Sequence, residues 1–462
     1  MFWTVVALGC YRLTDHHPVA ELRACWLPKT LARLYHDSMR KSVGAGYAHL
    51  LTVPNPRHVA SLVDYFTRGS KPRSQWRFGI EIEHLPVRND GSDAPVSYEG
   101  ERGIEALLSA LEPCYDGDAE YREDGHLVGL SRPGCVVSLE PGSQVECSLG
   151  VLRDSREFED LYRRFRAEAD PIAERLGFRL VEYGYRPAGS YADVSINPKE
   201  RYAVMNTYLG RIGQCGPMMM RSTASTQISI DYQDEDDAIA KIRLGTAIGP
   251  ILAYFFRNTP IFEGEPNSMP LRRQRIWDWL DTQRTGLIPG LFEDGFGWED
   301  YAVDMLSTPL MVADVSHTPE VEGPQGKQVF IAWHENAGEI YPDRLLNDAE
   351  MAHILTTHFN DVRLKNYIEL RHWDSLPMKR ASRLLEIVGG IFYDSARFAR
   401  LVGLLDGVSE EDVFQAKADL QVRGGQARPY GHSMDFWRQA LDAEDTLDDL
   451  PGDPRHPNLF QS

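Results

Sequence analysis

The sequence predicts an α+β protein in which half-buried antiparallel strands are combined with amphipathic helices. Four separate segments alternate between polar and apolar residues with a period of two, at residues 79–84, 138–148, 223–231 and 366–371. Apolar residues at helical spacing lie before and between these segments. Hydrophobic residues make up 42% of the 462 residues and charged residues 25%, which is typical of a globular chain with a packed core.

The chain is strongly acidic. It has 49 Lys and Arg residues against 68 Asp and Glu residues, a formal net charge of −19. This excess of negative charge disfavours nucleic acid and anionic membrane surfaces as partners. No apolar run approaches the roughly 20 residues that cross a bilayer, so no membrane span is predicted. The composition also excludes a collagen-like, coiled-coil or wholly disordered chain.

Cysteine usage and periodicity along the chain indicate its organisation. Six cysteines are too sparse for a disulfide framework, and no CxxC pair or zinc-ligand spacing occurs, so we predict reduced thiols and a cytoplasmic location. Residues 1–50 show little periodicity and are predicted to be a poorly ordered leader, or a stretch outside the native protein, with Met39 as a candidate start. A single domain is predicted over residues 51–440, followed by a tail at residues 441–462.

Four helices are predicted from their apolar stripes, at residues 58–67, 103–111, 155–176 and 235–257. The third follows Asp154, with Glu157 three residues later at the spacing of a capping box, and Gly177 is expected to end it. The fourth begins with an acidic run. The helix dipole favours negative charge at this end, so we interpret the run as a helix start and not as a metal cluster.

The predicted strands carry an unusual number of carboxylates on their polar faces. The first strand is expected over residues 76–87, and a Pro-Gly turn at residues 141–142 divides the second segment. Side chains two residues apart lie on the same face of a strand, so the acidic residues within a segment point together. The polar-face residues with oxygen ligands are Glu81, Glu83, Glu140, Gln144, Glu146 and Glu369.

Two interpretations of these carboxylates are open. A half-buried antiparallel strand shows the same alternation whatever its function, because one face meets water. The first two segments, however, carry Glu and Gln with no Lys or Arg between them. Clustered carboxylates repel one another unless cations lie among them. Hard divalent cations such as Mg²⁺ take oxygen ligands and leave room for phosphate oxygens, so we favour a magnesium site.

Basic residues lie in three further stretches: one before the methionines, one in a turn at residues 283–286, and one that leads into the fourth strand segment and continues within it. The basic residues are Arg201, Arg284, Arg363, Lys365 and Arg371. Arginine forms bidentate pairs with carboxylates and phosphates, although a surface ion pair is the alternative for any single one. The methionines at residues 218–220 are predicted to serve packing or to form an apolar wall, and not to take part in chemistry. No GxGxxG or GxxxxGK[ST] loop is present, which disfavours a Rossmann or P-loop nucleotide site.

Six stretches, in this order, resemble the plant-type and bacterial glutamate–cysteine ligases, also called gamma-glutamylcysteine synthetases. They are FGIEIEH (78–84), SLEPGSQVECS (138–148), PKERYAVM (198–205), STASTQISIDY (222–232), RTGLIPGLFE (284–293) and DVRLKNYIELR (361–371). The resemblance covers about residues 55–440. It implies a glutamine-synthetase-like fold, in which a twisted antiparallel sheet covered by helices forms a concave active-site cradle, with the catalytic domain at residues 51–440.

The resemblance also implies an activity. The enzyme would join the γ-carboxylate of L-glutamate to the amine of L-cysteine through γ-glutamyl phosphate, with ATP as co-substrate and two or three Mg²⁺ ions. This is the first step of low-molecular-weight thiol synthesis. The downstream thiol, feedback control and the choice between monomer and homodimer stay open. The alternatives are a ligase of the same fold with another amine acceptor, and a non-catalytic nucleotide-binding relic.

Roles of single residues follow from motif position in the resembling family. The metal ligands would be Glu81, Glu83, Glu140 and Glu146, with Gln144 and Glu369 as weaker candidates. Arg201 and Arg284 would hold the α-carboxylate of glutamate, and Tyr202 would line the cysteine pocket. Arg363, Lys365 and Arg371 would face phosphate oxygens. Plant enzymes have Glu-His-Glu-Lys where this chain has Glu-Ile-Glu-His, so His84 receives no role.

Overall fold

The computed structural model describes residues 54–115 and 120–443. The leader predicted at residues 1–50 lies outside this part of the chain, as does the predicted tail beyond Ala443. Leu441 and Ala443 are fully buried. The packed body therefore runs slightly past the predicted boundary at residue 440.

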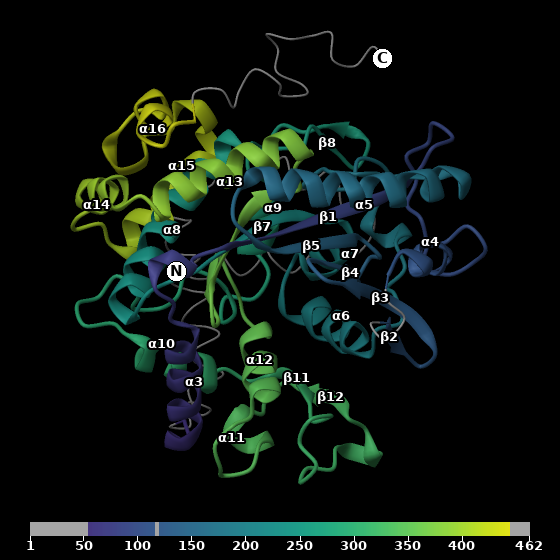
Figure 1. The fold of residues 1–462 in the computed structure, drawn as a ribbon, viewed down its shortest axis with the longest axis horizontal. Coiled ribbons are helices and arrows are strands. Elements are labelled where there is room, and N and C mark those ends of the chain that lie inside the picture. The colour runs from purple at the N-terminus through teal and green to yellow at the C-terminus, as the bar shows by residue number, and fades with distance from the viewer. Residues whose placement is uncertain (1–53, 116–119, 444–462) are drawn as a thin grey trace, which may run out of the picture. The chain divides into compact units, whose positions relative to one another are not determined.

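The centre of the fold is a nine-stranded sheet in the order β14-β15-β7-β1-β5-β4-β3-β2, with β6 pairing to the second half of β1 (Figure 1). Its strands are β1 (Phe78–Arg88), β2 (Glu120–Glu123), β3 (His126–Arg132), β4 (Cys135–Leu139), β5 (Val145–Leu152), β6 (Phe178–Val181), β7 (Ser225–Ile230), β14 (Val362–Leu364) and β15 (Ile368–Asp374). All neighbouring strands in it are antiparallel. The four predicted strand segments all contribute to this sheet, which confirms the α+β prediction.

The register of the strands brings the predicted carboxylates to one face. Glu83 of β1 lies opposite Glu146 of β5, and Glu81 is two residues away on the same side of β1. Glu369 of β15 lies opposite Ser229 of β7, the strand between β15 and β1. Directly opposed residues of antiparallel strands share a face. Acidic side chains from distant parts of the chain therefore converge on one surface of the sheet.

Three long helices cover the opposite, apolar face. They are α5 (Ser155–Arg175), α8 (Glu235–Phe255) and α13 (Met378–Phe392). Helices α5 and α13 pack side by side, and α8 packs against β14 and β15 (Figure 1). Ile80, Ile82 and Ile228, which alternate with the polar residues of β1 and β7, are almost fully buried beneath this layer. Burial of this face against helices leaves the other face of the sheet free to carry polar side chains.

Helix α8 is long and apolar enough to cross a membrane by length and composition alone, although no span was predicted from the sequence. Within the described residues it is the one helix with this property, and 83% of its apolar window is buried inside the protein. Its burial against the sheet accounts for its composition, because a core helix is apolar on most sides.

Local signals explain where the predicted helices begin and end. The carboxylate of Asp154 accepts hydrogen bonds from the amides of Arg156 (3.0 Å) and Glu157 (3.1 Å) at the start of α5. The reciprocal bond of a capping box is displaced by one residue, because the carboxylate of Glu157 accepts from the amide of Arg153 at 2.7 Å. Gly177 follows α5 with φ +78°, a conformation that glycine adopts without strain. Helices α3 (Pro56–Gly69) and α4 (Ile104–Leu111) also match their predictions.

Many shorter elements were not predicted. The helices among them are α6 (Glu200–Ile212), α7 (Gly216–Ser222), α9 (Arg272–Asp278), α10 (Trp298–Ser307), α11 (Ala337–Ile340), α12 (Asp348–Thr356), α14 (Ser395–Leu404), α15 (Glu410–Arg423) and α16 (Met434–Ala440). The two-stranded sheets pair β8 (Ile261–Phe262) with β9 (Glu265–Pro266), β10 (Thr285–Gly286) with β13 (Phe359–Asn360), and β11 (Met311–Asp314) with β12 (Val329–Ala332). Helices α3, α10, α11 and α12 gather with β11 and β12 at one end of the molecule (Figure 1).

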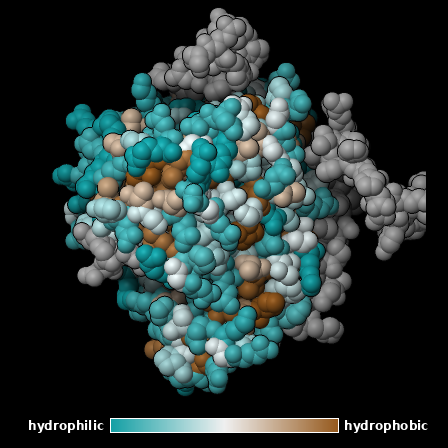
Figure 2. All heavy atoms as spheres, turned by 90° about the vertical axis from the view of Figure 1, so that its right-hand side faces the viewer, coloured by the Kyte–Doolittle hydropathy of each residue, from teal (hydrophilic) through white to brown (hydrophobic). Residues whose placement is uncertain are grey.

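Hydrophilic residues cover much of the face drawn in Figure 2. Figure 2 shows a face on which hydrophobic residues form several patches separated by hydrophilic ones.

Candidate active site

A pocket of about 200 Å³ lies on the polar face of the central sheet. Its lining includes every residue predicted for the site except Arg284. These residues are Glu81, Glu83, Glu140, Gln144, Glu146, Arg201, Tyr202, Arg363, Lys365, Glu369 and Arg371. The convergence predicted from the alternating strands is therefore confirmed as geometry.

One side of the pocket is acidic, and polar side chains of the sheet hold its carboxylates in place. Glu83 accepts hydrogen bonds from the amide and the hydroxyl of Ser225, at 2.9 and 2.6 Å, and from Nε2 of Gln227 at 3.1 Å. Glu146 accepts from the hydroxyls of Ser138 and Ser148, at 2.9 and 3.1 Å. These contacts orient the carboxylates without neutralising them, because every donor is uncharged.

Burial and mutual repulsion raise the pKa values of the acidic side. Burial has the largest effect on Glu81, Glu83 and Glu140, and the negative charge of Glu146 raises all three further. The pKa of Glu140 reaches about 8. Carboxylates crowded in this way are stabilised by any cation that enters among them.

The turn between β4 and β5 delivers Glu140 and Gln144 to the pocket. Ser143 has φ +61° in this turn, and a Cβ on Gly142 would lie 2.5 Å from the carbonyl oxygen of Arg221, so only glycine fits against α7. Nε2 of Gln144 donates to the carbonyl of Thr223 at 2.8 Å. Its buried Oε1 has no hydrogen-bond partner in the described structure. Gln144 therefore presents a fixed and unused oxygen at the pocket.

The start of α6 supplies Arg201 and Tyr202. The hydroxyl of Tyr202 donates to the carbonyl of Leu139 at 3.0 Å, and Nζ of Lys199 donates to the same carbonyl at 2.8 Å. The ring of Tyr202 lines the pocket while its hydroxyl fixes the end of β4. The guanidinium of Arg201 lies 5.9 Å from the centre of that ring and also reaches the pocket.

The other side of the pocket is cationic and is organised around Glu369. Its carboxylate lies 2.6 Å from Arg363, 2.9 Å from Lys365 and 2.8 Å from Arg371. Burial alone would raise the pKa of Glu369, but these three cations hold it well below its usual range. Glu369 was predicted as a weaker metal ligand. The structure places it as the counter-ion of the three predicted phosphate-facing residues, because β14, β15 and the turn between them carry all four groups.

A bulge directs Arg371 into this cluster. Leu370 pairs with Ile228 and Trp373 with Thr226, so two residues of β15 oppose the single residue Gln227. Bulges of this kind change the direction of side chains beside functional sites. The guanidinium of Arg371 accordingly hydrogen-bonds Oε1 of Gln227 and links β15 to the carboxylates of β1.

Arg284 does not line the pocket, although it was predicted to hold the substrate carboxylate. Its side chain is fully buried, and Nε lies 3.1 Å from the carboxylate of Asp281, three residues earlier in the same turn. Its carbonyl oxygen accepts from the amide of Phe359 at 2.6 Å, and Phe359 lines the pocket. Arg284 therefore lies one layer behind the pocket wall, because the turn directs it back toward Asp281.

The remaining lining residues form an apolar wall, and only part of this wall was predicted from the sequence. Met219 and Met220 form part of an apolar wall, as predicted for residues 218–220, and Met205 joins them. Trp277 and Phe359 complete this wall from α9 and β13. These two elements are too short to show a period, so composition gives no signal for them. Gln227 could have been found from the sequence, because it lies on the polar face of β7 and alternates with the isoleucines of the apolar face.

The oxygen atoms of the pocket fit a metal held jointly with a phosphate. In the parts of the chain that the structure describes, no group of three His, Cys, Asp or Glu side chains could bind an ion by itself. Magnesium is usually held by one or two carboxylates together with substrate phosphates and waters. Glu81, Glu83, Glu140 and Glu146, with the side chain of Gln144, offer such ligands beside the three cations that surround Glu369.

Comparisons with known proteins identify a family for the chain. Residues 77–420 match the family model described as glutamate-cysteine ligase family 2 (GCS2). The chain is 32% identical over 368 residues to the chloroplastic glutamate–cysteine ligase of Medicago truncatula, covering 79% of this chain and 70% of that protein. It is 30% identical over 364 residues to chloroplastic glutamate–cysteine ligase A of Oryza sativa subsp. japonica, covering 79% and 72%.

One solved structure resembles the chain, with lower sequence identity than these relatives. The glutamate–cysteine ligase of Francisella tularensis in complex with AMP matches with a TM-score of 0.44 and 11% identity, covering 81% of this chain and 79% of that one. This likeness is too weak to support the fold assignment, which rests on the sheet and helices described above.

Proposed function

The chain belongs to glutamate–cysteine ligase family 2, and from this premise we propose that its pocket joins L-glutamate to L-cysteine at the expense of ATP. The observation that carries the proposal is the division of one pocket into an acidic side and a cationic side within the matched residues 77–420. An enzyme that brings a carboxylate and a triphosphate together needs positive charge to offset their repulsion. It also needs ligands for the cation that accompanies ATP.

Two steps would occur in this pocket. In the first, an oxygen of the glutamate γ-carboxylate attacks the γ-phosphorus of ATP, and ADP leaves as the bond to its β-phosphate oxygen breaks. In the second, the amine nitrogen of cysteine attacks the acyl carbon of γ-glutamyl phosphate. Inorganic phosphate leaves, and the amine loses a proton. The products are γ-glutamylcysteine, ADP and phosphate.

The chain's own residues have separate tasks in these steps. Arg363, Lys365 and Arg371 would bind the transferring phosphoryl group, for which charge and position matter more than covalent chemistry. Arg201 would bind a substrate carboxylate, and Tyr202 with the methionine wall would enclose the amine substrate and exclude water. Bound Mg²⁺ would neutralise the phosphates and stabilise the phosphoryl transition state. Glu81, Glu83, Glu140, Gln144 and Glu146 would hold it.

The proposal is tested by measuring ADP release with Mg·ATP, L-glutamate and a panel of amino acids as the amine. We expect ADP only when glutamate and cysteine are both present, with γ-glutamylcysteine identified by mass. Turnover with another amine but not with cysteine would make the protein a ligase of different specificity. Nucleotide binding without turnover on any amine would make it a relic. The cytoplasmic location and the choice between monomer and homodimer stay predictions.

Binding of Mg·ATP is expected to release protons near pH 7. The pKa of Glu140 is raised to about 8 by burial and by the charges of Glu146 and Glu83, so most of this group is protonated at pH 7. A bound cation favours the charged carboxylate and lowers its pKa, which releases the proton. Titration calorimetry in two buffers of different ionisation enthalpy measures this release. Equal heats in both buffers would contradict the assignment, and Glu140→Gln should reduce the difference.

A further inference from the structure

His84 lies directly behind the acidic side of the pocket. It follows Glu83 in β1 and therefore points to the opposite face of the sheet, where its side chain is fully buried. The motif Glu-Ile-Glu-His contains it, yet neither the pocket nor the proposed reaction uses it. A buried histidine is often only a core residue whose ring nitrogens have hydrogen-bond partners. The partners of His84 therefore decide whether it also influences the pocket.

The position of Glu83 is weakly determined by the sheet itself. The pairing of β1 with β7 ends at Ile82, opposite Thr226. The pairing of β1 with β5 ends at His84, opposite Val145, and from Leu85 onward β1 pairs with β6 instead. Both neighbouring strands thus leave β1 within one residue of Glu83. Glu83 therefore lies past the end of the β7 ladder and one residue from the end of the β5 ladder, where fewer ladder bonds fix β1 than along its first half.

Two side chains add hydrogen bonds at this point. The hydroxyl of Ser375 donates to the carbonyl oxygen of Glu83 at 2.6 Å. Nδ1 of His84 lies 2.8 Å from the carbonyl oxygen of Val145. A carbonyl can only accept, so His84 carries a proton on Nδ1 and donates it there. Val145 stands between Gln144 and Glu146, so this bond fixes the first residue of β5 at the point where its pocket ligands begin.

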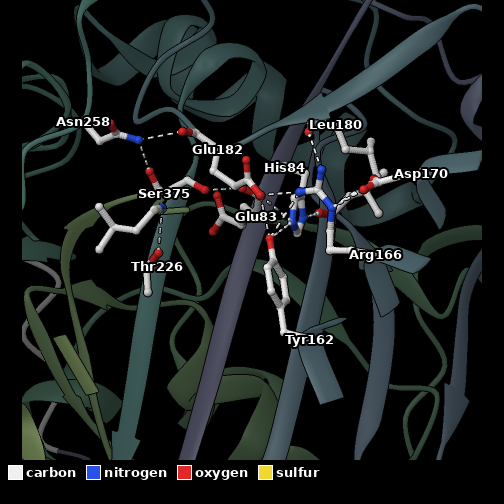
Figure 3. A network of polar contacts seen from close by, with 12 residues as sticks. Glu83, His84, Tyr162, Arg166, Asp170, Leu180, Glu182, Thr226, Asn258 and Ser375 are labelled. Carbon is white, nitrogen blue, oxygen red and sulfur yellow. Dashed lines mark hydrogen bonds and ion pairs between the residues drawn. The ribbon is translucent and has the colours of Figure 1, made fainter. Parts of the chain in front are cut away.

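A buried network holds the imidazole from behind. Figure 3 shows Tyr162 of α5 between His84 and Glu182, with its hydroxyl 2.7 Å from Nε2 of His84 and 2.7 Å from Oε1 of Glu182. Arg166 forms an ion pair with the same carboxylate. Asn258 links this network to Ser375, because its Nδ2 donates to the carbonyls of Glu182 (2.6 Å) and Ser375 (2.8 Å). Because Nε2 of His84 is then unprotonated, the single proton of the Tyr162 hydroxyl is donated either to Nε2 or to Glu182, and Arg166 compensates the charge of Glu182 in both cases.

We infer that His84 is a positioning residue that sets the distance between the carboxylates of Glu83 and Glu146 from the far side of the sheet. It touches neither substrate nor metal. Its bond to Val145 holds β5 against β1 where the ladder ends, and Tyr162 keeps the ring aimed at that carbonyl. Loss of a partner that orients metal ligands typically weakens metal binding by about tenfold to a hundredfold. The inference rests on the proposed magnesium–nucleotide site.

Two substitutions separate the two ring nitrogens. In His84→Asn the amide nitrogen replaces Nδ1 and can still donate to Val145, whereas in His84→Gln it corresponds to Nε2 and reaches toward Tyr162. Calorimetric titration with Mn²⁺, in the presence of a non-hydrolysable ATP analogue, measures metal affinity without turnover. We expect about tenfold weaker Mn²⁺ binding for His84→Gln, and binding within about twofold of wild type for His84→Asn. The Mg²⁺ concentration for half-maximal activity should shift in parallel.

Tyr98→Phe is the matched control, since it also removes a buried side-chain bond to a carbonyl, that of Leu127 at 2.9 Å, on β3 away from the pocket. It should lower thermal stability without changing Mn²⁺ affinity. Equal Mn²⁺ affinity in wild type, His84→Gln and His84→Asn would overturn the inference. Mn²⁺ binding weakened equally in both variants would also overturn it, because His84 would then act only by filling space in the core. Failure of wild type to bind Mn²⁺ with the analogue would instead contradict the proposed function.

A milder variant keeps the test decisive if substitutions of His84 prevent folding. Tyr162→Phe retains the ring and removes only the hydroxyl that orients His84. We expect Mn²⁺ binding about threefold weaker in this variant, the effect of one modest hydrogen bond. Unchanged affinity in a folded Tyr162→Phe protein would overturn the inference.

Discussion

Glu146→Gln is expected to lower the rate of ADP formation by about two to three orders of magnitude while the fold persists. Glu146 lies opposite Glu83 in the sheet, and its charge raises the pKa values of Glu81, Glu83 and Glu140. Glutamine has the same shape and can still accept from the serine hydroxyls of β4 and β5. It cannot supply the negative charge that a magnesium–nucleotide complex needs at the centre of the acidic side.

The same change should stabilise the protein in the absence of nucleotide. Removing one charge from a repelling cluster lets the remaining carboxylates ionise more easily, so thermal unfolding without Mg²⁺ should occur at the wild-type temperature or above it. Glu140→Gln is expected to behave alike. Steady-state ADP formation and thermal unfolding are measured beside Glu99→Gln, an exposed control that should match wild type. Near-normal turnover in both pocket variants would remove these residues from the site.

The acidic side of the pocket could be predicted because a strand determines the direction of its side chains locally. Alternation with a period of two was enough to show that Glu81 and Glu83 point together, and the same holds for Gln144 and Glu146. The pairing of strands was not available from periodicity, since β1 and β7 are separated by more than a hundred residues. The family resemblance supplied that step, and the register of Glu83 opposite Glu146 agrees with it.

Residues in turns and short elements were harder to predict. Arg284 has the right chemistry for a substrate carboxylate, but the turn that begins at Asp281 returns its side chain to the carboxylate of Asp281. In the sequence Glu369 cannot be distinguished from the other acidic residues. Only the pairing of β14 with β15 shows that Arg363 lies beside it. The role inferred for His84 depends on α5 and β6, whose positions behind β1 leave no mark in the motif that contains it. Such contacts are set by tertiary packing, which local propensity does not encode.

Glu369→Gln is expected to lower the free energy of unfolding by about 3–5 kcal/mol at pH 7, because it leaves three buried cations without their counter-ion. Glu369 is 1% exposed, so water does not compensate for the loss. Despite the opposing effect of burial, Arg363, Lys365 and Arg371 hold its pKa well below the ordinary value of 4.5. A carboxylate with a lowered pKa stabilises the fold above its ordinary pKa, and this contribution is lost as the pH falls through the folded value. The difference between variant and wild type should therefore be complete at pH 7 and narrow below about pH 4.5.

Urea unfolding at pH 7 and at pH 4 measures this difference, with and without Mg·ATP. The three cations freed in Glu369→Gln should bind phosphate oxygens more readily, so ATP should stabilise the variant more than it stabilises wild type. Asp348→Asn is the matched control, since it breaks an exposed ion pair of 2.7 Å with Arg68 and should change stability by less than about 1 kcal/mol. A Glu369→Gln protein as stable as wild type at pH 7, or one that gains no extra stability from ATP, would show that these cations do not form the phosphate side of the pocket.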